Sequence, residues 1–257
     1  MRILVVGSGG LIGRALLRAA PASVHTLVGL DRAACDVSDP AARTRALKHH
    51  RPEAVLFCAA FTDVDGAAQS PLSHAVVSHA VNVEAPIAWA REVPTWFLSS
   101  NFVFDGPGPH PPHEASRPTS VYATQKVKAE AGVLAAGGHV VRVGWVHGPG
   151  GRTFASTVEP RLRANETVRA IYDVVVQPTH VDDVARALLN LPRGLTHLMG
   201  AGETSWYGFA LAVQARLGSG RVVPVRSADL GLGPRPRDAR LSPAKLPPWW
   251  LRAPITR

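Results

Sequence analysis

The feature that most constrains the fold is a glycine-rich turn between an apolar N-terminal run and a helical pattern. Residues 2–6 are mainly aliphatic and end abruptly at Gly7, as a strand buried on both faces does. Residues 7–13 read Gly-Ser-Gly-Gly-Leu-Ile-Gly, and from Gly10 apolar residues recur at helical spacing until Pro21. Such glycines permit a tight turn and close backbone approach, while the helix N-terminus offers free N–H groups to an anion. The pattern predicts a strand–turn–helix unit that binds a dinucleotide pyrophosphate.

An acidic residue follows the second expected strand, residues 24–30. Asp31 lies about 20 residues beyond the glycine turn, where an acid binds the adenosine ribose hydroxyls. Its carboxylate favours NADH, because it repels the 2′-phosphate of NADPH, whereas the adjacent Arg32 could bind that phosphate. Both NADPH and NADH therefore stay open as the cofactor.

Strand-like and helix-like segments alternate along the rest of the chain. Further strands are expected at residues 54–60, 95–99, 139–143 and 168–172. Helices are expected at residues 40–50, 71–91, 119–136, 181–190 and 205–217. A proline-rich surface loop is expected at residues 105–118, and the last forty residues are expected to wrap the surface. This alternation predicts βαβ units and a parallel sheet with right-handed crossovers.

The predicted fold is α/β: a Rossmann-type doubly wound parallel sheet with a smaller C-terminal substrate-binding lobe. Residues 1–145 are assigned to the NAD(P)-binding Rossmann domain. Residues 146–257 are assigned mainly to the substrate-binding lobe, with an interleaved boundary and some return to the Rossmann domain.

Composition narrows the class of protein further. Hydrophobic residues make up 46% of the chain and charged residues 18%, so a substantial core can form. No stretch approaches the roughly 18 apolar residues that span a bilayer, and the N-terminal run lacks a signal-peptide cleavage site. The expectation is a cytoplasmic protein without a membrane partner. Cys35 and Cys58 have no pairing motif, and Cys58 is expected to act as a small hydrophobe.

The net charge of +9 raises the question of nucleic-acid binding. The lysines and arginines are scattered, however, with no run of like charges and no interleaved aromatic stripe. We therefore expect no nucleic-acid partner. A basic surface can instead attract a small anion such as a sugar nucleotide.

Tyr122 and Lys126 lie four residues apart on an expected helix, so their side chains share one face. A free tyrosine has a pKa of about 10, and a neighbouring lysine cation, together with NAD⁺ when it is present, favours the phenolate and lowers that pKa. Such a pair can exchange a proton with a carbonyl. Ser99 and Ser100, at the end of the fourth expected strand, can donate a hydrogen bond to the same carbonyl oxygen.

Several longer motifs resemble one known family. Among them are Phe102-Val-Phe-Asp-Gly, Tyr122-Ala-Thr-Gln-Lys and Arg142-Val-Gly-Trp-Val-His-Gly. Other matching stretches are residues 7–13, 30–40, 51–55, 58–65, 81–86, 177–179, 202–207, 235–241 and 245–246. On these stretches the chain resembles the extended short-chain dehydrogenase/reductases, and within them the dTDP-4-dehydrorhamnose reductase family. The resemblance covers almost the whole chain.

The resemblance implies a role for each matched position. The catalytic residues would be Ser100, Tyr122 and Lys126, with Ser100 preferred over Ser99. The cofactor would be held by Gly7, Gly10, Leu11, Ile12, Gly13, Asp31, Arg32, Asp36, Val37, Ala59, Ala60, Tyr122 and Lys126. The substrate would contact Thr62, Asn101, Phe102 and Trp145. The implied reaction is NAD(P)H-dependent reduction of the 4-keto group of a nucleotide-activated, dTDP-linked 6-deoxysugar.

The substrate-facing positions depart from the family pattern. The family usually reads Ser-Thr-Asp-Tyr where this chain reads Ser99-Ser-Asn-Phe, and His147 replaces a usual tyrosine. Ser100 keeps the catalytic hydroxyl, but Phe102 lacks a phenol that could contact the sugar. Loss of such a hydroxyl changes discrimination among hydroxylated substrates.

Other functions stay open beside this reaction. The cofactor could serve a reductase of another ketone or imine in secondary metabolism, and relatives on this fold include non-catalytic regulatory or binding subunits. Epimerases and dehydratases share the Tyr/Lys pair but usually have longer chains. The resemblance also allows a homodimer. No metal site is predicted, because the histidines lack cysteine or carboxylate partners at ligand spacing.

Overall fold

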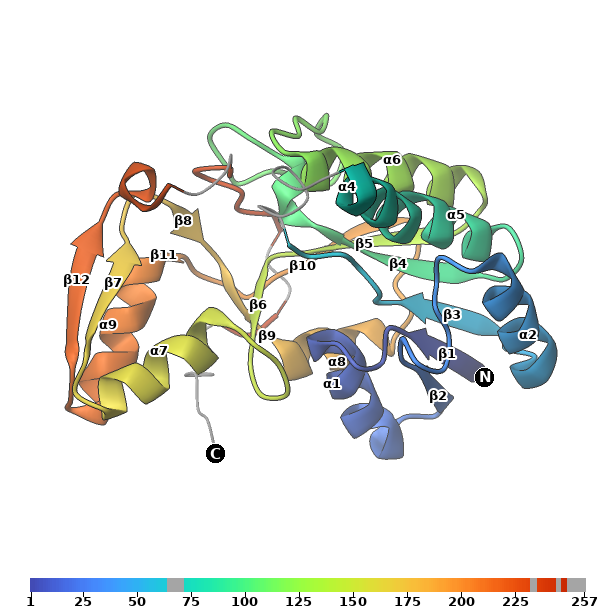
Figure 1. The fold of residues 1–257 in the computed structure, drawn as a ribbon, viewed down its shortest axis with the longest axis horizontal. Helices are drawn as coiled ribbons and strands as arrows, with labels where there is room; N and C mark the ends of the chain where they lie inside the picture. Colours follow the sequence, from blue (N-terminus) through green and yellow to red (C-terminus); the bar gives the residue numbers. More distant parts are fainter. Residues whose placement is uncertain (64–71, 232–234, 244–245, 249–257) are drawn as a thin grey trace.

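The computed structural model describes residues 1–63, 72–231, 235–243 and 246–248, and its centre is a six-stranded parallel sheet (Figure 1). The strands of this sheet are β1 (Arg2–Val6), β2 (Thr26–Leu30), β3 (Ala54–Phe57), β4 (Thr95–Ser100), β5 (His139–Val143) and β10 (Leu195–Leu198). Their spatial order is β2-β1-β3-β4-β5-β10, so the winding reverses between β1 and β3. In open α/β sheets, ligands bind in the crevice beyond the carboxyl ends of the strands at such a switch point.

Helices cover both faces of the sheet, which confirms the predicted Rossmann-type class. One face is covered by α1 (Leu11–Ala19) and α8 (Val181–Leu188), and the other by α2 (Pro40–His50), α5 (Ala85–Ala90) and α6 (Val121–Ala135). Alternate residues of β1 serve the two cores: Ile3 and Val5 face the α1–α8 side, while Leu4 and Val6 face the other. All four are fully buried, as the unbroken apolar run predicts.

A smaller lobe lies beside the sheet, on the left of Figure 1. Here α7 (Phe154–Arg163) and α9 (Trp206–Leu217) pack on the parallel pair β7 (Thr167–Ile171) and β12 (Arg221–Val225). Two short pairs join this lobe to the rest: β6 (Trp145–His147) with β9 (Pro178–His180), and β8 (Val175–Val176) with β11 (Thr204–Ser205). The chain then returns to the large sheet through α8 and β10.

Two predicted elements differ most from the structure in their bounds, while several others differ by one or two residues at an end. β3 ends at Phe57, and residues 58–62 leave the sheet at its carboxyl edge. The helix expected at residues 71–91 is α4 (Leu72–His79), a π turn over Ala80–Glu84 and α5; residue 71 lies outside the described residues. Pro86 has no N–H to donate, so the regular hydrogen-bond pattern cannot continue across this point.

The expectation for the chain's last forty residues is wrong in part. β12 pairs with β7, and Ala239 and Leu241 are buried between the lobe and the sheet. The strand β10 was not predicted, because its central residues Thr196 and His197 are polar and only its pairing with β5 orders it. Residues 244–245 and 249–257 lie outside the described part. Of the helices in the described ranges, none is both long and apolar enough to cross a membrane.

Candidate active site

Two glycines of the N-terminal turn are required by close backbone contacts. Gly7 has φ +84°, and a Cβ there would lie 2.5 Å from the Ala59 nitrogen. A Cβ on Gly13 would lie 2.5 Å from the Gly7 carbonyl oxygen. Gly10 is the N-cap of α1, and within the described residues no side chain caps this helix. The N–H groups of the first turn are thus available to an anion.

A cavity of about 860 Å³ opens at the carboxyl ends of β1, β2 and β3. Most of the expected cofactor residues line it: Gly7, Gly10, Leu11, Ile12, Arg32, Asp36, Val37, Ala59 and Ala60. Gly13 and Asp31 are not among the described residues that line this cavity. Gly13 acts instead through packing, and the Asp31 carboxylate accepts a hydrogen bond from the Ala34 amide at 2.9 Å.

The charges around this first cavity suit a dinucleotide. Arg14, Arg32 and Arg152 contribute guanidinium groups to its lining. Asp36 also lines this cavity. The hydroxyl and amide of Ser38 donate to its carboxylate and lower its pKa, so the cavity contains one negative charge. Backbone N–H groups, arginines for phosphates and a carboxylate for ribose hydroxyls are the donor set that NAD(P) requires.

Cys58 also lines this first cavity, just beyond the end of β3. Burial raises the pKa of its thiol to about 12, so the side chain is uncharged at neutral pH. The prediction of a small apolar residue holds, but the residue lies in the loop rather than in the strand.

A second cavity, of about 740 Å³, adjoins the first, and Thr62 and Val146 line both. It includes all of the residues expected at the substrate, as well as two of the expected catalytic residues: Thr62, Ser100, Asn101, Phe102, Tyr122 and Trp145. Tyr122 and Lys126 were also expected to contact the cofactor. Tyr122 lines the second cavity, and the buried Lys126 ammonium lies 5.7 Å from the centroid of its ring. Their contact with the cofactor stays a prediction.

The helix α6 positions the Tyr122–Lys126 pair. The Ser120 side chain caps the helix by accepting from the Ala123 amide at 3.2 Å, which places Tyr122 in the first turn. One turn later the Lys126 ammonium donates to the Leu98 carbonyl at 2.9 Å and lies 5.7 Å from the Tyr122 ring centroid. The lysine is only 2% exposed.

In this structure Lys126 does not by itself lower the pKa of Tyr122. Burial raises the pKa of Tyr122 to about 12, although a hydrogen bond with Ser100 partly offsets this. Burial also lowers the pKa of Lys126 to about 8. The cost of desolvating the phenolate therefore exceeds any gain from the lysine. At neutral pH the phenol is protonated, which is the form that can donate a proton.

The two serines at the end of β4 have different partners. The Ser100 hydroxyl caps the short turn Asn101–Val103 by accepting from the Phe102 amide at 3.2 Å, and it faces the second cavity. The Ser99 hydroxyl donates to the buried Glu130 carboxylate at 2.5 Å. Asn101 also has a structural partner, because its amide donates to the Ala239 carbonyl at 3.0 Å.

An aromatic cluster forms one wall of the second cavity. The Trp145 ring lies 4.4 Å from that of Trp206 and 5.8 Å from that of Phe154, measured between centroids. Neither Trp206 nor Phe154 was predicted as a site residue, since only the fold brings them to Trp145. His147, one of the departures from the family pattern, is fully buried behind this wall, and burial lowers its pKa to about 4.

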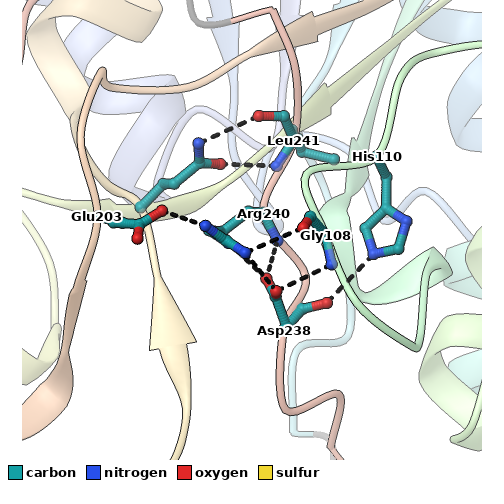
Figure 2. A network of polar contacts seen from close by, with 7 residues as sticks. Gly108, His110, Glu203, Asp238, Arg240 and Leu241 are labelled. Atoms are coloured by element: carbon teal, nitrogen blue, oxygen red, sulfur yellow. Dashed lines mark hydrogen bonds and ion pairs between the residues drawn. The ribbon is translucent and has the colours of Figure 1, made fainter.

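A segment of residues 235–243, here termed the crossing segment, contributes to the lining of the second cavity. Figure 2 shows the polar contacts that hold this segment. The Asp238 carboxylate accepts from the Gly108 amide at 2.9 Å, and Arg240 donates to the Gly108 carbonyl at 2.9 Å. Arg240 also pairs with Glu203 of the smaller lobe and, at 2.7 Å, with Asp238. His110 approaches the Asp238 carbonyl at 3.2 Å. The crossing segment thus joins the proline-rich loop to the smaller lobe.

The crossing segment and β7 bring positive charge to the second cavity. Arg169, Arg235 and Arg237 line it, and none was predicted as a site residue. Arg235 lies in a stretch that matches the family, but its distance from Tyr122 cannot be read from the sequence. Within the described ranges, no group of three or more His, Cys, Asp or Glu residues could hold a metal ion.

Comparisons with known proteins agree with this geometry. The RmlD substrate binding domain family matches residues 1–250. A dTDP-4-dehydrorhamnose reductase of Mycobacterium tuberculosis is 35% identical over 256 residues, which cover 91% of this chain and 81% of that protein. A dTDP-4-keto-6-deoxy-D-glucose reductase of Streptomyces niveus is 31% identical over 250 residues, with 92% and 86% coverage.

Among solved structures, a dTDP-4-dehydrorhamnose reductase of Bacillus anthracis in complex with NADP has the same fold. It superposes with a TM-score of 0.87 at 21% identity and covers 96% of this chain and 95% of its own. The family match over nearly the entire length and the relatives above 30% identity lead to one assignment. The chain belongs to the RmlD substrate-binding domain family.

Proposed function

We propose that the chain is an NAD(P)H-dependent reductase of the 4-keto group of a dTDP-linked 6-deoxysugar. The observation that carries this proposal is the contact between two cavities of different chemistry. The first has the glycine turn and the arginines that suit a dinucleotide, and the second is lined by Tyr122 and Ser100. Thr62 and Val146 line both, so a nicotinamide and a carbonyl can meet there.

The first cavity would hold NADPH or NADH, with its pyrophosphate at the N-terminus of α1 and its adenosine ribose near Arg32 and Asp36. When bound, this cofactor supplies a hydride. Arg32 lines the cavity whereas the Asp31 carboxylate accepts from a backbone amide, and this favours binding of a 2′-phosphate.

In the second cavity, Ser100 would donate a hydrogen bond to the substrate carbonyl and Tyr122 would transfer its proton to the developing alkoxide. The hydrogen bond of Ser100 with Tyr122 indicates that the two hydroxyls lie close enough to act on the same carbonyl oxygen. Ser100 suits this role better than Ser99, whose hydroxyl is already donated to Glu130. Lys126 would stabilise the phenolate that remains after proton transfer.

The outer part of the second cavity would hold the nucleotide diphosphate. Arg169, Arg235 and Arg237 line this cavity, and guanidinium groups bind phosphate oxygens in pairs of hydrogen bonds. Trp145, Thr62 and Phe102 would contact the sugar. We accordingly assign residues 1–145 mainly to the cofactor-binding domain and residues 146–257 mainly to the substrate-binding lobe, with an interleaved boundary. Thr62, Phe102 and Trp145 would reach the sugar from the first part, and β10 of the second part returns to the large sheet.

The test is NADPH oxidation by the purified full-length protein with a panel of dTDP-4-keto-6-deoxysugars, other ketones and cyclic imines. The proposal predicts turnover with at least one dTDP-4-keto sugar, and the reduced sugar as the product by NMR. Turnover confined to the ketones or imines would instead support a reductase of secondary metabolism. No turnover, with retained NADPH binding, would support a non-catalytic subunit.

Two further expectations remain predictions. A homodimer predicts twice the chain mass by light scattering after gel filtration. A cytoplasmic location predicts the protein in the soluble fraction after the cells are broken.

A further inference from the structure

A buried acid lies on the same face of α6 as the proton-delivery pair. Tyr122, Lys126 and Glu130 follow one another at a spacing of four residues, so they form a row along the helix. Glu130 is 4% exposed. A carboxylate in such a place needs compensation, since burying an unpaired charge is costly.

Two neighbouring strands of the sheet supply that compensation. Arg142 of β5 donates to both oxygens of Glu130, at 2.9 and 2.6 Å, in a bidentate pair. Ser99 of β4 donates to the same carboxylate at 2.5 Å. Ser99 and Arg142 are register partners on adjacent strands, and Ser100 follows directly. The carboxylate therefore ties the carboxyl end of β4 to α6.

Arg142 is itself fixed from several sides. Its guanidinium donates to the Pro112 carbonyl and to the Ser116 hydroxyl, both at 3.2 Å, and lies 3.4 Å from His197 of β10. It also stacks 4.8 Å from the centroid of the Phe104 ring. Glu130 is thus held by a rigid partner and cannot swing away without breaking this set of contacts.

The charge of Glu130 acts on Lys126. Burial lowers the pKa of Lys126, and Glu130 opposes that shift. Cys58 also faces Lys126, but its thiol pKa of about 12 leaves it neutral at physiological pH. Among the described residues, the charged groups that act on or contact the Glu130 carboxylate are Lys126 on its own helix and Arg142 on β5, and His197 of β10 contacts Arg142.

We propose that Glu130 is a positioning residue for proton delivery: paired with Arg142 and Ser99, it keeps Lys126 charged and holds Ser100 opposite Tyr122. Because this rests on the proposed reductase activity, its test includes a measurement that does not need turnover.

The test is the pH profile of kcat/KM for Glu130→Gln in the full-length protein with NADPH. Loss of the proton of Lys126 should produce the descending limb at high pH. Removing the Glu130 charge lowers the pKa of Lys126, so this limb should move to lower pH by about one unit. Arg142→Gln removes the opposite charge and should move the limb to higher pH. Glu130→Asp keeps the charge and should leave the limb in place.

Glu159→Gln is the matched control, since Glu159 is equally buried and pairs with Arg163 on α7, away from both cavities. It should leave the profile unchanged. Ser99→Ala changes no charged group, so it can be tested even if Glu130→Gln and Arg142→Gln fail to fold. It should lower kcat severalfold with the limb in place.

Titration of the Lys126 ammonium by NMR gives the same shifts without substrate. If wild-type protein reduced no carbonyl, the proposed function would fail while this titration still tested Glu130. A uniform loss of activity at all pH values in Glu130→Gln, with an unshifted lysine titration, would overturn the positioning role. A wild-type kcat in Ser99→Ala would overturn the claim that Glu130 positions Ser100 through Ser99 at the end of β4.

Discussion

The two cavities are built in different ways. The first is formed largely by the turns after β1, β2 and β3, which are near one another in the sequence and at one edge of the sheet. The second draws its lining from residues between Thr62 and Ala239, on both the sheet and the smaller lobe. The first depends on backbone geometry at Gly7 and Gly13, and the second on side chains that only the complete fold assembles.

Because of this difference, we expect cofactor binding and substrate binding to respond to different substitutions. Cofactor binding should tolerate changes in the parts of the smaller lobe that do not reach the first cavity, whereas substrate binding should depend on every segment that reaches the second cavity. Variants that affect one cavity and spare the other therefore test the comparison.

The largest effect is expected for Tyr122→Phe. The phenol lines the second cavity only, so kcat should fall by about 10²–10⁴-fold while the Kd for NADPH changes by less than about twofold. Steady-state kinetics and NADPH fluorescence titration measure the two quantities. Activity close to that of the wild type would remove Tyr122 from the mechanism.

A buried histidine should make the substrate side sensitive to acid. Burial lowers the pKa of His147 from 6.5 to about 4, so below pH 6.5 the unfolded chain binds a proton that the folded protein excludes. The free energy of unfolding should therefore decrease as pH falls from 6.5 to about 4, by at most about 3 kcal/mol from this group.

Urea unfolding of wild type and His147→Phe at pH 7 and pH 4.5 measures this contribution. Carboxylates and other histidines titrate in both proteins, so the difference between the two isolates His147. Equal pH dependence in both proteins would show that His147 does not contribute.

Arg240→Met should weaken substrate binding. The side chain joins the crossing segment to Gly108 and Glu203, and its loss should loosen the wall that carries Arg235 and Arg237. KM for the sugar substrate should increase about tenfold, with an NADPH Kd within about twofold of wild type. Arg161→Met, which breaks an exposed ion pair with Glu166, is the control. If the NADPH Kd increased as much as the sugar KM, the claim that the two cavities bind their ligands independently would be contradicted.

The smallest effect is expected in the first cavity, for Arg32→Ala. If Arg32 contacts the 2′-phosphate, the Kd for NADPH should increase about fivefold and that for NADH should stay within about twofold. Arg45→Ala, an exposed arginine on α2, is the matched control. An equal increase in the Kd values of NADPH and NADH would show that Arg32 does not recognise the 2′-phosphate. Arg32 would then contact the diphosphate or attract both nucleotides through its positive charge.

The sequence predicts features that depend on neighbouring residues, but not those that depend on contacts between distant parts of the chain. β1, the glycine turn, α2 and β5 follow from hydrophobic period and turn chemistry, so their bounds agree closely with the structure. β10 has a polar centre and depends on a partner strand distant in sequence.

The same limit applies to the site. Trp206, Arg169 and Arg237 reach the second cavity only through the fold, and the pKa of Tyr122 depends on burial that the spacing to Lys126 does not report. His110 lies in the stretch predicted as a proline-rich surface loop, yet it is buried against Phe104 and the crossing segment.

The central claim is that the first cavity delivers hydride to a carbonyl held in the second. The most direct test uses NADPH deuterated at the transferable C4 position, together with the dTDP-4-keto-6-deoxysugar that the panel identifies. The prediction is one deuterium at C4 of the product sugar for each NADPH oxidised, by NMR and mass spectrometry. A product without deuterium, or sugar conversion without NADPH oxidation, would contradict the claim.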